Sequence, residues 1–133
     1  MSVFVDTSAL LAIIDADEFH HPAAKAAWNE LITSDETLVC TNYVLIETFA
    51  LLQSRLGLKA ARLFQEDIVP VLTIDWVDDL SHAAGTTAWL TAGRGKLSLV
   101  DCVSFESMRR LGIKTALTLD RHFKEQGFEC LPK

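Results

Sequence analysis

Long hydrophobic runs are absent from this sequence of 133 residues. The longest, Ala9–Ile14, has six residues, whereas about 20 are needed to cross a bilayer. No basic residue precedes this run and Asp6 stands in front of it, which does not fit a signal peptide. The length suits one domain with a sizeable core. We therefore expect a single domain over residues 1–133, cytoplasmic and without a membrane partner.

Cysteine is also scarce. Cys40, Cys102 and Cys130 are odd in number, far apart and in no CxxC pair. This pattern excludes a disulfide framework and gives no support to a zinc site. We interpret the three as small buried apolar residues.

Positive charge is scarce in the first part of the chain. The net charge is −6, and the first 50 residues hold eight acids but a single base, Lys25. A uniformly basic nucleic-acid-binding face is therefore excluded, although bases gather later in the chain. Four of them are candidates for phosphate contacts, or otherwise belong to a solvated surface: Arg94, Lys96, Arg121 and Lys124.

Short β-rich apolar runs alternate along the chain with amphipathic segments, and short loops separate them. The expected strands are Ser2–Val5, Leu38–Cys40, Val71–Ile74, Thr115–Leu119 and Phe128–Cys130. The expected helices are Thr7–Ile14, Ala23–Ile32, Asn42–Leu56, Leu58–Ile68, Trp76–Ala92, Ser98–Leu111 and His122–Gln126, with Asp75 as the cap of the fifth. This alternation predicts an α/β fold with a parallel sheet covered by helices on both faces.

Four carboxylates stand alone in apolar stretches: Asp6, Glu47, Asp101 and Asp120. Asp6 and Asp120 follow expected strands, and the carboxyl ends of parallel strands form the ligand-binding edge of such a sheet. Asp101 and Glu47 lie early in helices that can reach the same edge. Four converging carboxylates repel one another, and a hard divalent cation such as Mg²⁺ or Mn²⁺ relieves that repulsion.

Each acid also has a structural interpretation. Asp6 can cap the first helix, and Ser98 with Asp101 has the spacing of a capping box. Asp120 can be a turn or cap residue. Glu47 fits neither role, so its structural alternative is a side chain that extends to the surface.

Taken together, these segments resemble the successive motifs of the PIN domain. They are Val5-Asp6-Thr7-Ser8-Ala9-Leu10, Glu47 in its apolar helix, Leu97-Ser98-Leu99-Val100-Asp101 and Thr118-Leu119-Asp120-Arg121-His122-Phe123. The likeness spans essentially the whole chain, and the four motifs in this order are strongly specific.

The resemblance implies a three-layer α/β/α sandwich and a ribonuclease that depends on Mg²⁺ or Mn²⁺. Asp6, Glu47, Asp101 and Asp120 would be its catalytic, metal-binding acids, supported by the hydroxyl of Thr7 or Ser8. Many single-domain relatives are VapC-type toxins of toxin–antitoxin pairs, usually dimeric and inhibited by an antitoxin. An RNA substrate, an antitoxin partner and a homodimer are therefore expected. Some relatives carry a further acid where this chain has His122, which bears on a second metal site.

The expected activity is endonucleolytic hydrolysis of RNA that leaves a 5′-phosphate and a 3′-hydroxyl. One alternative is a catalytically silent PIN fold that serves as an RNA-binding or assembly subunit. Another is a phosphoryl-accepting receiver module with Asp75 as acceptor, although no lysine follows the last strand at a suitable place.

Overall fold

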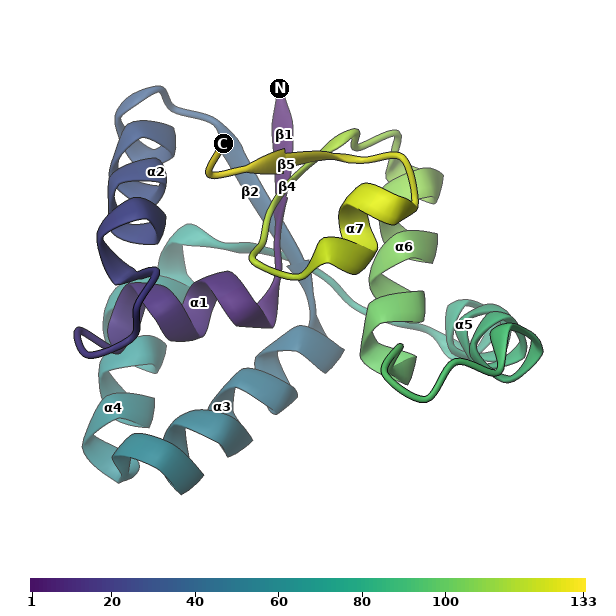
Figure 1. Ribbon diagram of the computed structural model, residues 1–133, viewed down its shortest axis with the longest axis horizontal. Helices are drawn as coiled ribbons and strands as arrows, with labels where there is room; N and C mark the ends of the chain where they lie inside the picture. Colours follow the sequence, from purple (N-terminus) through teal and green to yellow (C-terminus); the bar gives the residue numbers. More distant parts are fainter.

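A computed structural model describes residues 1–133 and contains one five-stranded parallel sheet. The strands are β1 (Ser2–Val5), β2 (Thr37–Thr41), β3 (Thr73–Asp75), β4 (Thr115–Leu117) and β5 (Glu129–Leu131). Their order in the sheet is β3-β2-β1-β4-β5, so β1 is central (Figure 1). Val3, Phe4 and Val5 are almost completely buried because β1 has a neighbouring strand on each side and helices on each face.

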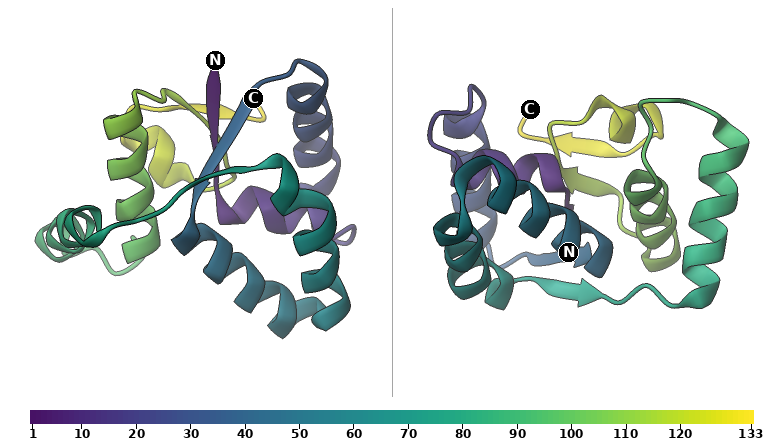
Figure 2. Two further views of the ribbon diagram at one scale, coloured as in Figure 1. Left: turned by 180° about the vertical axis from the view of Figure 1, so that it is seen from behind. Right: turned by 90° about the horizontal axis from the view of Figure 1, so that it is seen from below.

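Seven α-helices surround the sheet: α1 (Thr7–Ile14), α2 (His21–Thr33), α3 (Asn42–Leu56), α4 (Leu58–Leu63), α5 (Asp79–Ala92), α6 (Leu99–Leu111) and α7 (Arg121–Glu125). Helices α1 to α4 lie on one side of the sheet and α5 to α7 on the other (Figures 1 and 2). The predicted α/β sandwich is confirmed. No helix is both long enough and apolar enough for a membrane span.

Side-chain caps and glycines set several helix ends. Thr41 accepts a hydrogen bond from the backbone of Val44 at the start of α3, and Gly57 ends that helix with a positive φ. Helix α6 begins at the Ser98 cap and ends at Gly112, again with a positive φ that favours glycine. Side-chain oxygens at the starts of these helices accept hydrogen bonds from free backbone N–H groups, and glycines at their ends allow the chain to turn away. The limits of these helices therefore follow from local sequence.

Several boundaries differ from the sequence prediction, including the start of α5 at Asp79 in place of Trp76. Residues Val69–Val71 form a 3₁₀ turn around Pro70, so β3 begins at Thr73. Strand β4 ends at Leu117 and β5 covers Glu129–Leu131. The predicted helix after Gly57 changes after α4 into a π-helical segment, Phe64–Ile68.

The prediction that Asp75 caps the fifth helix is wrong. Asp75 is the last residue of β3, and its Oδ2 accepts hydrogen bonds from Arg110 Nη2 at 2.6 Å and Ser107 Oγ at 2.5 Å. The cap is Asp78, whose Oδ1 accepts from the backbone N of Ser81 at 2.8 Å. Asp75 is therefore bound to α6, which also removes the acceptor that a receiver module would need.

Helix α5 packs against α6 at the margin of the molecule (Figure 2). Gly85 permits this close approach, because a Cβ there would lie 2.5 Å from Cγ2 of Val103. The cysteines are all free, with Cys40 and Cys102 buried and Cys130 partly buried.

Candidate metal centre

The order of the sheet creates a crevice at the carboxyl ends of β1 and β4. From β1 the chain proceeds to β2 and β3 on one side, and then returns to β4 and β5 on the other. Ligands bind in open parallel sheets where the strand order reverses in this way. Asp6 follows β1 directly, and its backbone N donates to the Leu117 carbonyl at 3.0 Å, which extends the β1–β4 pairing.

Hydroxyl groups hold the Asp6 carboxylate in this crevice. Its Oδ2 accepts hydrogen bonds from Ser8 Oγ at 2.7 Å and from Thr118 Oγ1 at 3.0 Å. Ser8 Oγ in turn accepts from the backbone N of Leu119 at 2.9 Å. The network joins the start of α1 to the segment after β4, so the position of Asp6 is set by both strands.

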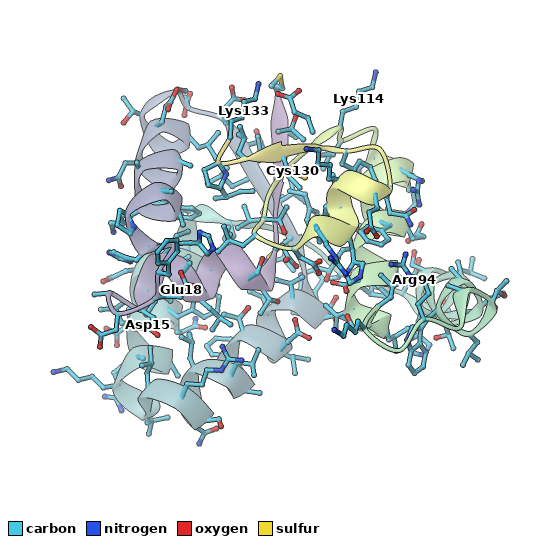
Figure 3. The ribbon with its side chains drawn as sticks, viewed as in Figure 1. Asp15, Glu18, Arg94, Lys114, Cys130 and Lys133 are labelled. Carbon is cyan, nitrogen blue, oxygen red and sulfur yellow. The ribbon has the colours of Figure 1, made fainter.

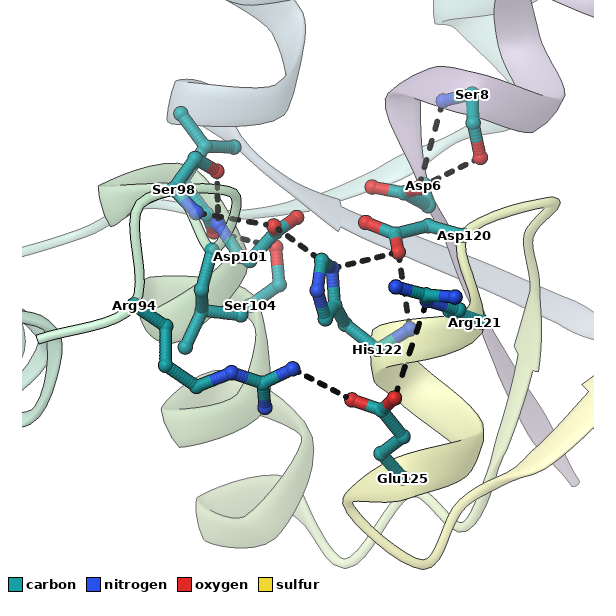
Figure 4. A network of polar contacts seen from close by, with 12 residues as sticks. Asp6, Ser8, Arg94, Ser98, Asp101, Ser104, Asp120, Arg121, His122 and Glu125 are labelled. Atoms are coloured by element: carbon teal, nitrogen blue, oxygen red, sulfur yellow. Dashed lines mark hydrogen bonds and ion pairs between the residues drawn. The ribbon is translucent and has the colours of Figure 1, made fainter. Parts of the chain in front are cut away.

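Asp101 and Asp120 each cap a helix and also face the crevice (Figure 4). Asp120 Oδ1 accepts from the backbone N of His122 at 2.9 Å and begins α7. Asp101 and Ser98 form both halves of a capping box at the start of α6, with distances of 3.0 and 3.2 Å. The capping interpretations and the convergence of the acids are therefore both correct, because a carboxylate has two oxygens and a cap uses one.

All four predicted acids line one cleft of about 450 Å³. Glu47 reaches it from α3 and forms no hydrogen bond or ion pair with the protein. Beside it, Thr48 Oγ1 donates to Thr7 Oγ1 at 3.4 Å, which links α3 to α1. The other polar residues that line the cleft are Thr7, Ser8, Glu18, His20, Arg55, Lys96, Ser98.

Burial and crowding make two of these carboxylates, Asp6 and Asp101, hard to ionise without a cation. Burial is the main cause that raises the pKa of Asp6 to about 7; the hydroxyls of Ser8 and Thr118 oppose the rise, while Asp101 and Asp120 add to it. Burial also raises the pKa of Asp101, against the opposing hydrogen bonds from Ser98 and with the charges of Asp120 and Glu47 adding to the rise. Because no lysine or arginine is ion-paired with any of the four, their repulsion is left for a bound cation to relieve.

The imidazole of His122 lies between Asp101 and Asp120 (Figure 4). Its Nδ1 is 2.8 Å from Asp120 Oδ1 and 4.0 Å from Asp101 Oδ2. The short approach to Asp120 is not aligned as a hydrogen bond, and neither ring nitrogen has a hydrogen-bond partner. One ligand atom from each of the three residues lies within 4.8 Å of the others.

Residues 3–129, nearly the whole chain, match the family described as PIN domain. The chain belongs to the PIN domain family. This PIN domain is 31% identical over 129 residues to the 23S rRNA-specific endonuclease VapC20 of Mycobacterium tuberculosis strains CDC 1551 and H37Rv. The aligned region covers 95% of this chain and 95% of VapC20.

Solved structures share the fold. The crystal structure of VapC20, described as a Sarcin-Ricin loop cleaving toxin, matches with a TM-score of 0.77 over 95% of each chain. FitAcB from Neisseria gonorrhoeae matches with a TM-score of 0.69 at 16% identity, over 98% of this chain and 96% of that chain. That second likeness concerns the fold alone. Family membership and the similarity to a named endonuclease place this PIN domain among the metal-dependent nucleases, as the sequence predicts.

Several cleft residues were not found by sequence reasoning. Glu18 lies in the loop after α1 (Figure 3), and His20 belongs to the same loop. Both residues line the cleft. Arg55 reaches it from the last turn of α3. His122, which lies beside Asp101 and Asp120, is named in the sequence analysis only as the residue that stands where some relatives carry a further acid, although its position two residues after Asp120 in the first turn of α7 is a usable signal.

The predicted phosphate contacts divide into two groups. Lys96 lines the cleft and has no ion pair. Arg94 and Arg121 instead pair with Glu125, at 3.1 and 3.9 Å, and neither lines the cleft (Figure 4). Lys124 is exposed and also lies outside it. The free positive charges of the cleft are therefore Lys96 and the unforeseen Arg55.

Proposed function

We propose that this protein is a metal-dependent endoribonuclease in which Asp6, Glu47, Asp101 and Asp120 form the active site. The observation that carries the proposal is their convergence: four carboxylates from separate elements line one cleft, and no lysine or arginine forms an ion pair with any of them. A purely structural acid in a protein interior is normally paired or fully hydrogen-bonded. Carboxylates that lack a cationic partner, as these do, are instead expected where a protein binds a metal cation.

The donor set fits Mg²⁺ or Mn²⁺, which prefer carboxylate oxygens. Asp6, Asp101 and Asp120 would hold the cation, and Glu47 would complete its ligands from α3. When bound, a divalent cation neutralises negative charge on the reacting phosphate and makes water a stronger acid. The hydroxyls of Ser8 and Thr118 keep the Asp6 carboxylate in one orientation, so little side-chain freedom is lost when the cation binds.

The two unpaired cations of the cleft suit a polyanionic substrate. Arg55 and Lys96 come from α3 and from the loop before α6, so they stand on different elements around the acids. Each would bind a phosphate and hold the RNA backbone across the site. In the reaction, water adds to phosphorus and the bond from phosphorus to the 3′ oxygen breaks. The products are a 5′-phosphate and a 3′-hydroxyl, which receives a proton.

We further propose that the protein is the toxin of a toxin–antitoxin pair. Support comes from the 31% identity to VapC20, which is described as a toxin that cleaves the sarcin–ricin loop of 23S rRNA. That RNA is therefore the first substrate to test. A homodimer is part of the same proposal. Trp76, just before α5, is 70% exposed and Leu80, in its first turn, is 77% exposed, and a second copy of the chain would cover both side chains. Light scattering measures the dimer directly.

The decisive test combines cleavage with metal binding. RNA containing the sarcin–ricin stem-loop, labelled at either end, is incubated with wild type or Asp6→Asn in Mn²⁺, Mg²⁺ or EDTA. We expect cleavage by wild type only, dependent on the cation, with a 5′-phosphate on the downstream fragment. In parallel, Mn²⁺ should raise the unfolding temperature of wild type more than that of Asp6→Asn.

Two outcomes would contradict the proposal in different ways. Stabilisation by Mn²⁺ without cleavage of this RNA or of total cellular RNA would favour the silent RNA-binding subunit. No response of either protein to Mn²⁺, together with a stability of Asp6→Asn no higher than that of wild type, would show that Asp6 has only a structural role and would remove the nuclease proposal.

A further inference from the structure

The imidazole of His122 is buried beside two acids of the cleft, Asp101 and Asp120, without a hydrogen-bond partner. Its side chain is only 9% exposed, and neither Nδ1 nor Nε2 forms a hydrogen bond. Buried polar groups are paired in the large majority of cases, so an unpaired ring that faces two carboxylates needs an explanation. Resting on the metal site proposed above, we propose that His122 binds the cation through a ring nitrogen and that the centre therefore selects Mn²⁺ over Mg²⁺.

The fold fixes the ring in this position. Asp120 caps α7 through the backbone N of His122, so the two side chains leave neighbouring points of one tight turn. Phe123, the next residue, is completely buried and packs against Phe4 and Phe105, which anchors α7 to the sheet and to α6. This anchor holds the backbone of α7 in place, and the imidazole faces Asp101 and Asp120 (Figure 4).

The spacing of the three side chains is close to that of a ligand set. One atom each from Asp101, Asp120 and His122 lies within 4.8 Å of the others. Ligands on opposite sides of a small divalent ion lie about 4.2 Å apart, twice the metal–ligand distance. The cluster therefore needs to contract by less than about 1 Å to surround an ion. Asp101 Oδ2 and Asp120 Oδ1, the oxygens nearest His122 Nδ1, also accept the capping hydrogen bonds, and a carboxylate oxygen has a second lone pair that can bind a cation.

A nitrogen ligand changes which cation is preferred. Mg²⁺ is a hard ion that keeps oxygen ligands and several waters. Imidazole suits transition ions better than it suits Mg²⁺, and Mn²⁺ is the first-row transition ion that shares the preference of Mg²⁺ for carboxylate oxygen. A centre of two carboxylates and one imidazole consequently favours Mn²⁺, whereas an all-carboxylate centre discriminates less.

The test measures Mn²⁺ binding by electron paramagnetic resonance, with Mg²⁺ as competitor, in the full chain without RNA. We compare wild type with His122→Gln, which removes the imidazole, and His122→Asp, which restores an oxygen ligand. His20→Gln is the matched control, because His20 also borders the cleft but stands outside the cluster. Circular dichroism verifies that each variant is folded.

We expect wild type to prefer Mn²⁺ by about tenfold or more, and His122→Gln to lose about tenfold or more in Mn²⁺ affinity. His122→Asp should bind Mg²⁺ better than wild type does, and His20→Gln should match wild type. Pulsed electron paramagnetic resonance of wild type should also show coupling between Mn²⁺ and a directly bound ¹⁴N. This signal needs no variant, so it tests the proposal even if a His122 substitution unfolds the protein.

A different role for His122 gives a different result. If the ring only supplies positive charge to Asp101 and Asp120, His122→Gln will bind both cations more tightly and wild type will show no ¹⁴N coupling. Equal affinity of wild type for the two cations without that coupling would also overturn the His122 proposal, while leaving the nuclease proposal intact. If wild type binds neither cation, both proposals fail.

Discussion

Asp6 and Asp75 occupy equivalent places in the sheet, yet the protein surrounds them differently. Each lies at the carboxyl end of a parallel strand, β1 for Asp6 and β3 for Asp75. Asp75 is paired with the guanidinium of Arg110 at 2.6 Å and with the Ser107 hydroxyl. Asp6 has only hydroxyl and backbone donors, and the charges that act on it are Asp101 and Asp120.

This difference distinguishes Asp75, which stabilises the fold, from Asp6, which is positioned to bind a cation. The Asp75 side chain is 16% exposed and gains from its cation, because a partly buried ion pair is screened less than a surface pair. The Asp6 residue is 3% exposed and has no such partner, so its negative charge costs free energy until a cation arrives. The predictions below test this contrast, beginning with the largest effect.

The largest expected difference between Asp6 and Asp75 is in how their substitution changes the rate of RNA cleavage. We expect Asp6→Asn to lower the single-turnover cleavage rate by more than about 100-fold, since loss of a ligand should exceed the 10- to 100-fold cost of losing a supporting residue. Asp75→Asn should retain the wild-type rate per folded molecule. Asparagine is as good a helix cap as aspartate, so Asp6→Asn should fold. Equal losses in the two variants would refute the contrast.

The stability of the metal-free protein should depend on pH through Asp6. Burial raises the pKa of Asp6 from 3.8 to about 7, so protonation stabilises the folded state; this stabilisation is complete below pH 3.8 and is lost as the pH rises through about 7. Relative to Asp6→Asn, wild type should lose up to about 4 kcal/mol of unfolding free energy between pH 4 and pH 8, at about 1.4 kcal/mol per pKa unit. Urea unfolding of both proteins in EDTA measures this. Parallel pH curves would show that Asp6 is not crowded or desolvated as the structure indicates.

Asp75 should show the opposite response to neutralisation. Asp75→Asn should lower the unfolding free energy at pH 7 by about 1 to 2 kcal/mol, a discounted value because Arg110 is partly exposed. The increase in unfolding temperature on adding Mn²⁺ should stay as in wild type, since Asp75 does not line the cleft. A double-mutant cycle with Arg110→Gln isolates the pair. A coupling free energy near zero would mean that Ser107 and packing hold Asp75.

The smallest expected effects concern the two free cations of the cleft. Lys96→Ala and Arg55→Ala should each weaken RNA binding a few-fold, and each should reduce the slope of log affinity against log salt by about 0.7. Arg94→Ala is the control, because Arg94 pairs with Glu125 outside the cleft. Fluorescence anisotropy with the catalytically impaired Asp6→Asn background measures all three. If Arg94→Ala changes the slope as much as Lys96→Ala, the RNA follows a different path.

Much of the fold follows from local sequence. Side-chain caps and glycines specify the limits of α3 and α6. The caps accept hydrogen bonds from backbone N–H groups within a few residues, and glycine adopts the positive φ that ends a helix. The predictions of short strands are weaker. The β-rich segment after Pro70 was expected to start a strand at Val71, but a 3₁₀ turn includes that residue and β3 begins at Thr73. Strand limits depend on pairing with neighbours that are distant in the sequence.

The sequence by itself determined the α/β class and identified four carboxylates that stand within or at the end of apolar stretches, since such isolated acids can be recognised from the sequence alone. It could not distinguish Asp6 from Asp75, because the cation that pairs with Asp75 lies 35 residues away on α6. Nor could it reveal that His122 is buried beside Asp101 and Asp120, since that depends on how α7 packs against α6 and the sheet. Tertiary structure alone decides whether a buried charge finds a partner within the protein or remains available for a cation from solution.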